Sequence, residues 1–203
     1  MTTPPRRRLG TLLFPDFELL DVFGPLEIFG HLSDHFDVVL VADRTGPVRS
    51  VQGARVLADH GFADCPPLDV LLVPGGPGTR RAVNDECLLD WLRARSAAAE
   101  LVMTVCTGSA LLARSGVLDG RRATSNKRAF DWAVSQGPRV EWVRRARWVD
   151  DGDVVTSSGV SAGIDMTLHV VARELGTELA ERLARRIEHA WHRDPDDDPF
   201  AGP

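Results

Sequence analysis

The stretch Glu100–Gly108, ELVMTVCTG, decides the fold, and Ser109–Gly116, SALLARSG, continues it. Leu101–Val105 is short, apolar and rich in β-branched residues, which predicts a buried strand. The residues from Thr107 to Ala113 predict a helix, and Cys106 stands at the junction. A buried strand that meets a helix at a nucleophilic side chain is the nucleophile-elbow pattern, which more commonly carries serine. The stretch therefore places Cys106 at a sharp strand-to-helix turn.

The residues after Cys106 are small, as such a turn requires. Gly108, Ser109 and Ala110 allow the helix to pack closely against its own strand. The helix N-terminus directs unpaired N–H groups and the positive end of its dipole toward the sulfur, which favours the thiolate. The alternative is a buried structural cysteine, because a free cysteine often serves as a small core residue.

Strand and helix patterns alternate along the rest of the chain. This alternation predicts a mostly parallel sheet covered by helices on both faces. Residues 45–59 contain two short β-like segments that suit a hairpin. Strands are expected at 8–14, 36–42, 69–73, 140–149 and 153–157, and helices at 22–29, 84–99, 126–136, 164–175 and 177–191.

Four features with chemical potential follow expected strands. They are Asp21, the turn Gly75-Gly76, Cys106, and the loop Ser158–Gly163. In parallel sheets, ligands bind outside the carboxyl ends of the strands. These four segments are therefore expected to form one site.

Each feature suggests a role in catalysis by a thiol. Cys106 would be the nucleophile, and the N–H groups of Gly76 and Thr107 would form an oxyanion hole. Asp21 would be a general acid or base, and the alternative is that it caps the helix that follows it. The sequence Gly75–Gly78 also suits a plain tight turn, and it lacks the Lys-Ser/Thr of a phosphate loop.

Composition narrows the function classes. A net charge of −5 without a basic stripe argues against nucleic acid as the main partner. No apolar run approaches the roughly 20 residues of a membrane span. Cys65, Cys87 and Cys106 form no paired framework, which favours a reducing cytoplasm. Residues 1–193 are expected to form one domain, and the acidic segment 194–203 has the composition of a mobile tail.

The same residues resemble the DJ-1/PfpI superfamily, whose members are class I glutamine amidotransferase-like. The resemblance extends over nearly the whole chain and implies a flavodoxin-like three-layer α/β sandwich with a nucleophile elbow. Within the superfamily the chain is most similar to the isocyanide (isonitrile) hydratase branch. Three segments carry this similarity: Leu20–Pro25 (LDVFGP), Val105–Ser109 (VCTGS) and Ser161–Asp165 (SAGID).

The resemblance implies hydration of a small-molecule isocyanide to an N-substituted formamide through a covalent thioimidate. It assigns the nucleophile to Cys106, its carboxylate partner to Asp21, and a contributing role to Thr107. We assign Gly75, Gly76 and Ser161 to substrate binding. Neither a metal nor an organic cofactor is expected, and relatives usually form homodimers.

Two departures from the relatives are visible. Peptidase- and chaperone-like relatives often place histidine directly after the cysteine, whereas this chain has Thr107. Some hydratase-like relatives have histidine shortly after the segment matched by Ala123–Ser125, where this chain has Asn126-Lys127. The first departure weakens a peptidase interpretation, and the second predicts a different polarity of the pocket.

Other functions compete with the hydratase. A glyoxalase- or amidase-like enzyme would use the same Cys106, and a ligand- or redox-sensing domain would use no catalysis. Gly159–Gly163 also matches G-x-S-x-G, so Ser161 could be a hydrolase nucleophile with Asp165 or Asp194 and His189 or His192. Too few residues follow Ser161 for the usual remainder of such a fold. His189 and His192 beside the acidic tail could bind a metal, but a solvated charged tail is the favoured interpretation.

Overall fold

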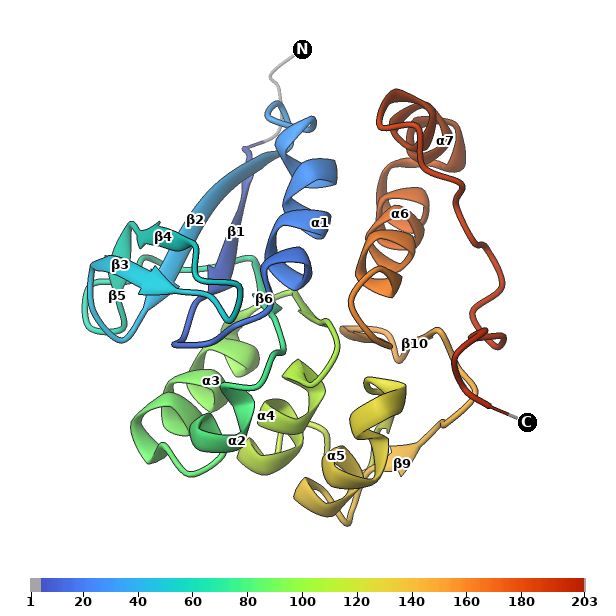
Figure 1. The fold of residues 1–203 in the computed structure, drawn as a ribbon. Helices are drawn as coiled ribbons and strands as arrows, with labels where there is room; N and C mark the ends of the chain where they lie inside the picture. Colours follow the sequence, from blue (N-terminus) through green and yellow to red (C-terminus); the bar gives the residue numbers. More distant parts are fainter. Residues whose placement is uncertain (1–4, 203) are drawn as a thin grey trace.

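A seven-stranded sheet forms the middle layer of residues 5–202, which the computed structural model describes (Figure 1). Only its edge strand β10 runs antiparallel to its neighbour β11, and every other neighbouring pair is parallel. The mostly parallel sheet expected from the sequence is therefore confirmed. In sheet order the strands are β10 (Trp148–Asp150), β11 (Val154–Ser157), β7 (Leu101–Thr104), β6 (Val70–Val73), β1 (Arg7–Leu12), β2 (Phe36–Ala42) and β5 (His60–Gly61).

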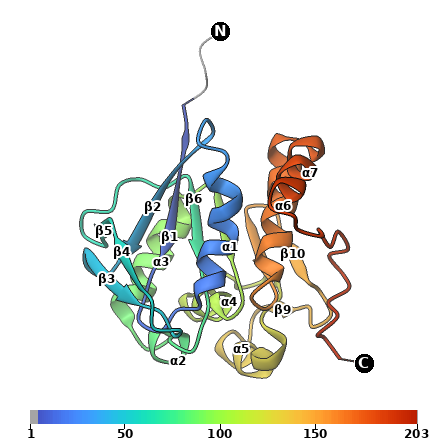
Figure 2. The ribbon, with the colours of Figure 1, turned by 45° about the horizontal axis from the view of Figure 1, so that its top comes forward.

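Helices cover both faces of this sheet (Figure 2). One face carries α1 (Leu19–Gly30), α6 (Ala162–Leu175) and α7 (Thr177–Arg186). The other carries α3 (Glu86–Ala98) and α4 (Gly108–Ser115), with α2 (Thr79–Ala82) and α5 (Phe130–Gln136) beside α4. The three-layer sandwich implied by the resemblance is confirmed.

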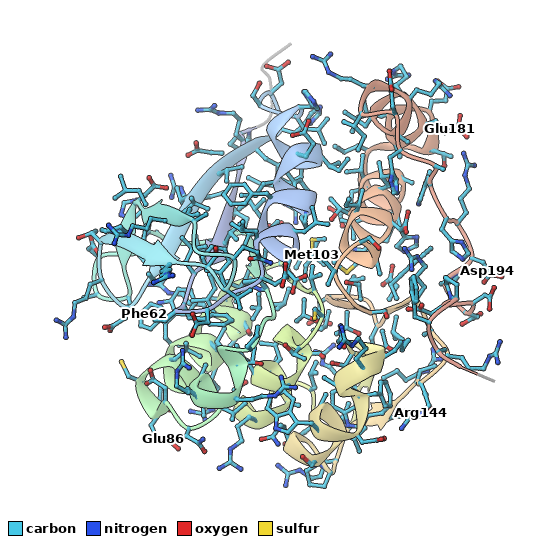
Figure 3. All side chains as sticks on the ribbon, viewed as in Figure 1. Phe62, Glu86, Met103, Arg144, Glu181 and Asp194 are labelled. Carbon is cyan, nitrogen blue, oxygen red and sulfur yellow. The ribbon has the colours of Figure 1, made fainter. Side chains whose placement is uncertain are left out.

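Buried strands explain the two-sided core. All four residues of β6 and all four of β7 are buried, as expected for strands that pack against helices on both faces. Met103 of β7 lies in the middle of the molecule, between α1 and α6, while Glu86 and Glu181 lie at its periphery (Figure 3). Within the described part of the chain, every helix is too short or too polar to cross a bilayer.

Several expected elements differ in length. The helix expected at 126–136 is a 3-10 turn, Lys127–Ala129, followed by α5. The strand expected at 140–149 is β10 plus β9 (Glu141–Trp142), which pairs with β8 (Arg122–Ala123) outside the main sheet. The hairpin of β3 (Gly46–Arg49) and β4 (Arg55–Ala58) is confirmed, as a separate two-stranded sheet. Two-residue strands are too short to show a periodicity, which is why the sequence does not reveal them.

Helix α7 ends five residues before the expected Trp191. The Glu188 N–H donates to the Arg185 carbonyl at 3.2 Å, and the His189 N–H donates to the Ala184 carbonyl at 2.9 Å. This is a Schellman closure, and Glu188 takes the left-handed conformation at φ 52° that glycine usually supplies. Without a glycine at this position, the stop leaves no signal in the sequence.

The acidic segment after Asp194 includes a carboxylate that is withdrawn from solvent. Asp198 is 3% exposed, and its N–H donates to the Arg145 carbonyl at 3.0 Å. Its carboxylate oxygens lie 3.9 Å from Lys127 Nζ and 3.9 Å from Arg147 Nη1. Burial lowers the pKa of Lys127 to about 8, although Asp198 opposes the shift. The mobility of the segment in solution stays a prediction.

The strand-to-helix turn at Cys106 has the geometry that the sequence predicts. Cys106 adopts φ 60°, a left-handed conformation that is uncommon outside glycine, and its N–H donates to the Ser158 carbonyl at 3.0 Å. A Cβ on Gly108 would lie 2.2 Å from the Val73 carbonyl oxygen. The helix α4 can therefore approach the end of β6 only because residue 108 has no side chain.

We expect Gly108→Ala to lower the free energy of unfolding by about 1–3 kcal/mol, because the added methyl overpacks the junction against backbone atoms. Urea denaturation measures this loss. Gly30→Ala is the matched control: nothing lies within 4 Å of its added Cβ, so the variant should be as stable as the parent or slightly more stable. Equal stability of the two variants would contradict the close approach at the junction.

Candidate active site

Three of the four segments predicted to form one site line a cavity of about 440 Å³, and Asp21 is buried next to it, where it accepts the Gly75 N–H. Cys106 and Thr107 line it from the turn after β7, and Gly76 lines it from the turn after β6. Val160, from the loop after β11, and Asn126 complete the part of the wall nearest to the sulfur. The carboxyl ends of neighbouring parallel strands bring these segments to one edge of the sheet.

The sulfur of Cys106 lies in a buried setting, because the residue is only 5% exposed. Burial raises the pKa of the thiol, and the nearby charge of Asp21 raises it further. The N–H groups of Thr107 and Val160 and the side-chain amide of Asn126 stabilise the thiolate and oppose that shift. The Thr107 N–H at the helix N-terminus thus favours the thiolate, as the sequence predicts, but the net direction is upward because desolvation is the larger effect.

Asp21 is the carboxylate next to this thiol. It is fully buried in the first turn of α1, and its Oδ2 accepts the Gly75 N–H at 2.8 Å. Burial raises the pKa of Asp21 to about 7, and the charge of Glu18 adds to this, whereas the Gly75 N–H and the Cys106 thiol lower it. The alternative role as helix cap is excluded, because Glu18 occupies the cap position.

The Asp21 carboxyl retains capacity for a proton. Its Oδ1 is buried and makes no hydrogen bond of ordinary geometry within residues 5–202. The Cys106 thiol, a weak donor, interacts with the same carboxyl. Thiol and carboxyl therefore form a buried pair that holds at least one proton at neutral pH.

The glycine turn serves this pair structurally. A Cβ on Gly75 would lie 2.5 Å from the Thr107 nitrogen and 3.0 Å from Asp21 Oδ2, so the turn fits only without a side chain there. The Gly75 N–H is taken by Asp21, and the Gly76 N–H donates to Thr107 Oγ1 at 3.1 Å. The oxyanion hole predicted from the Gly76 and Thr107 N–H groups is therefore not open in this structure, because the first N–H is bound to Thr107 Oγ1 and the second faces the Cys106 sulfur.

Thr107 acts through two different groups. Its N–H stabilises the Cys106 thiolate, while its hydroxyl holds the Gly76 N–H. Thr79 supports this contact: its hydroxyl donates to the Gly76 carbonyl at 2.7 Å and lies 3.1 Å from Thr107 Oγ1. Sequence reasoning missed Thr79, because it lies on the short helix α2, which shows no sequence pattern of its own.

The loop 158–163 contributes through Val160 rather than Ser161. Val160 adopts φ 44°, a strained conformation for a β-branched residue, and its N–H faces the sulfur. Ser161 lines a smaller neighbouring cavity of about 230 Å³ and not the one at Cys106. Its assignment to substrate binding is therefore not supported by the geometry. No side-chain pattern could have revealed Val160, since its backbone makes the contact.

Asn126 lines the cavity, and its side-chain amide faces the sulfur. Its Oδ1 accepts the Ala129 N–H at 3.1 Å, which leaves its amide nitrogen for the sulfur side. A Cβ on Gly159 would lie 2.5 Å from that nitrogen, so the loop packs tightly against the amide. Lys127 is directed elsewhere, with its Nζ donating to Thr124 Oγ1 at 2.8 Å.

The serine-hydrolase alternative lacks its central contact. His189 Nε2 and Asp165 Oδ1 are 2.8 Å apart, but no hydrogen bond joins Ser161 to His189 or His192 in residues 5–202. The other carboxylate oxygen of Asp165, Oδ2, accepts from the guanidinium of Arg147 at 2.8 Å. Over the same residues, no group of three or more His, Cys, Asp or Glu side chains is arranged to hold a metal ion.

The buried carboxyl predicts a specific pH dependence of stability. The pKa of Asp21 is about 7 in the folded protein, against about 3.9 for an unperturbed aspartate. Between these values the folded state binds more protons, so the free energy of unfolding falls as pH rises, by up to about 1.4 kcal/mol per pH unit. Asp21→Asn keeps an oxygen for the Gly75 N–H and removes this titration.

We therefore expect Asp21→Asn to be more stable than the parent protein at pH 8, with the difference shrinking toward pH 4.5. Urea denaturation at the two pH values measures it. A difference that is the same at both would show that the carboxyl does not titrate in this window.

Known proteins are similar to this chain in sequence and in fold. Residues 7–173 match the model of the DJ-1/PfpI family. The chain is 37% identical to the isonitrile hydratase of Pseudomonas putida over 183 residues, which are 90% of this chain and 78% of that protein. It is 30% identical to the HTH-type transcriptional regulator GbdR of Pseudomonas aeruginosa, covering 96% of this chain but only 55% of the regulator.

Among solved structures, a ThiJ/PfpI family protein from Pseudomonas syringae superposes with a TM-score of 0.81 at 31% identity. The match covers 98% of this chain and 79% of that one. The chain therefore belongs to the DJ-1/PfpI family.

Proposed function

We propose that this protein hydrates an isocyanide to an N-substituted formamide, with Cys106 as nucleophile and Asp21 as proton carrier. The observation that carries the proposal is the buried Asp21 carboxyl, with a pKa of about 7, beside the thiol of Cys106, which lines the cavity. The identity with an isonitrile hydratase supports the choice of substrate class.

In the first step the sulfur bonds to the terminal carbon of the isocyanide. The thiol proton passes to Asp21 and from there to the same carbon, so R–N≡C becomes the thioimidate R–N=CH–S–Cys106. A carboxyl with a pKa near the working pH both accepts and donates this proton readily. Asp21 is therefore a carboxylate again at the end of the step.

In the second step water attacks the thioimidate carbon. Asp21 as carboxylate accepts one proton from the water and passes it to the nitrogen, which gives R–NH–CH(OH)–S–Cys106. The C–S bond then breaks as the C=O bond forms, the hydroxyl proton passes to the sulfur, and R–NH–CHO leaves. One water is consumed per turnover.

Negative charge develops on the sulfur when the thiol gives up its proton before the attack and again when the C–S bond breaks. The N–H groups of Thr107 and Val160 and the amide of Asn126 stabilise that charge. Fixed donors in a buried site are worth more than in water, because they need no reorganisation during the reaction. They offset the cost that burial imposes on the thiolate.

A ligand- or redox-sensing role is the second candidate, because the chain matches the regulator GbdR along 96% of its own length. Under that role, mild peroxide would convert Cys106 to the sulfinic acid and no isocyanide would be consumed. The homodimer and the cytoplasmic location expected from the sequence also remain proposals.

We expect Cys106→Ala to abolish formation of N-cyclohexylformamide from cyclohexyl isocyanide, because the variant cannot form the thioimidate. Product is measured by chromatography. Cys87→Ala is the control, since Cys87 is exposed on α3 and does not line the cavity. Asp21→Asn should lower kcat by roughly 100-fold or more. Full formamide production by Cys106→Ala would end the proposal.

A further inference from the structure

Two guanidinium groups also line the cavity at Cys106, those of Arg80 and Arg128. In residues 5–202 no salt bridge of 4.0 Å or shorter joins either of them to a carboxylate. Their neighbour Arg81 differs, because it pairs with Asp16 at 2.6 Å and lines another cavity. Cationic side chains that line a ligand cavity and have no carboxylate partner suggest that an anionic ligand pairs with them.

Arg80 is an exposed residue whose guanidinium is held by two neighbouring side chains. Its guanidinium carbon lies 3.5 Å from the centre of the Trp132 ring, and its Nη1 donates to Thr79 Oγ1 at 3.1 Å. Thr79 in turn contacts Thr107, next to the nucleophile. A guanidinium stacked by its face on an aromatic ring leaves donors at its edge for a ligand.

The remaining charge at the cavity wall, Glu18, does not neutralise the arginines. Its carboxylate accepts a hydrogen bond from the Gln52 side-chain amide. It lies close enough to Asp21 to raise the pKa of that carboxyl. The cavity wall therefore carries two cations and one anion, and within residues 5–202 no salt bridge of 4.0 Å or shorter joins Glu18 to either arginine.

We propose that Arg80, assisted by Arg128, binds a carboxylate on the substrate, so that the isocyanide turned over is an isocyano carboxylate. The isocyanide carbon meets the Cys106 sulfur, and the carboxylate takes the edge donors of Arg80. An arginine–carboxylate contact is planar and two-pronged, which fixes the orientation of a small molecule as well as its affinity. This assignment of substrate class rests on the proposed function.

The direct test compares isocyanoacetate with its neutral methyl ester. We expect kcat/KM to favour the carboxylate, and the ratio of the two values to fall roughly tenfold in Arg80→Gln, as loss of a charge-assisted hydrogen bond predicts. Arg81→Gln is the matched control and should leave the ratio unchanged. Arg128→Gln provides a second variant, with a smaller decrease, if Arg80→Gln proves unstable.

A second test does not depend on hydration. Iodoacetate and iodoacetamide both alkylate thiols, and only the first carries a carboxylate. At each cysteine we divide the rate of alkylation by iodoacetate by the rate with iodoacetamide. This ratio should be higher at Cys106 than at the exposed Cys87. The excess at Cys106 should fall in Arg80→Gln but not in Arg81→Gln. Peptide mass spectrometry separates the two cysteines.

The two tests separate the inference from the proposed function. Hydration of both isocyanides with ratios that do not depend on Arg80 or Arg128 would overturn the carboxylate site and leave the hydratase standing. An Arg80-dependent preference for iodoacetate without any hydration would overturn the hydratase and support the anion site. A preference for the carboxylate in both tests supports both.

Discussion

The burial of Asp21 beside Cys106 is the constraint on which the site depends. A carboxyl and a thiol that are buried next to each other are not both ionised at neutral pH, because burial disfavours both charges, so the pair keeps a proton. The fold removes the carboxyl from water on the first turn of α1 and gives it one strong donor, the Gly75 N–H. The result is an acid whose pKa of about 7 allows proton transfer in either direction.

Such a pair forms only where backbones approach without side chains between them. Gly75 separates Asp21 from Thr107, and Gly108 lets α4 begin against the end of β6. The same closeness uses up the N–H groups that would otherwise be free for a substrate. Charge on the sulfur is therefore stabilised by the elbow itself and by the loop after β11, in which Val160 keeps a strained backbone.

Much of this arrangement could be predicted from the sequence. The strands β2 and β6, the elbow and the closing glycine after α4 follow from apolar runs and from Gly116, which adopts φ 85°. The coincidence of Asp21, the glycine turn and Cys106 follows from the rule for carboxyl ends of parallel strands. The end of α7 could not be predicted, because Glu188 adopts a left-handed conformation that is uncommon for glutamate.

The sequence by itself determined the α/β class and the family resemblance, and it singled out Cys106 and Asp21 as the candidate nucleophile and acid. Only the tertiary structure decided the protonation of the pair, since a pKa depends on burial and neighbouring charge rather than on residue type. The tertiary structure also places the backbone N–H of Val160, and not Ser161, at the sulfur, and it pairs the Gly76 N–H with Thr107. Backbone donors are identical in every residue except proline, so a sequence pattern cannot show where they point.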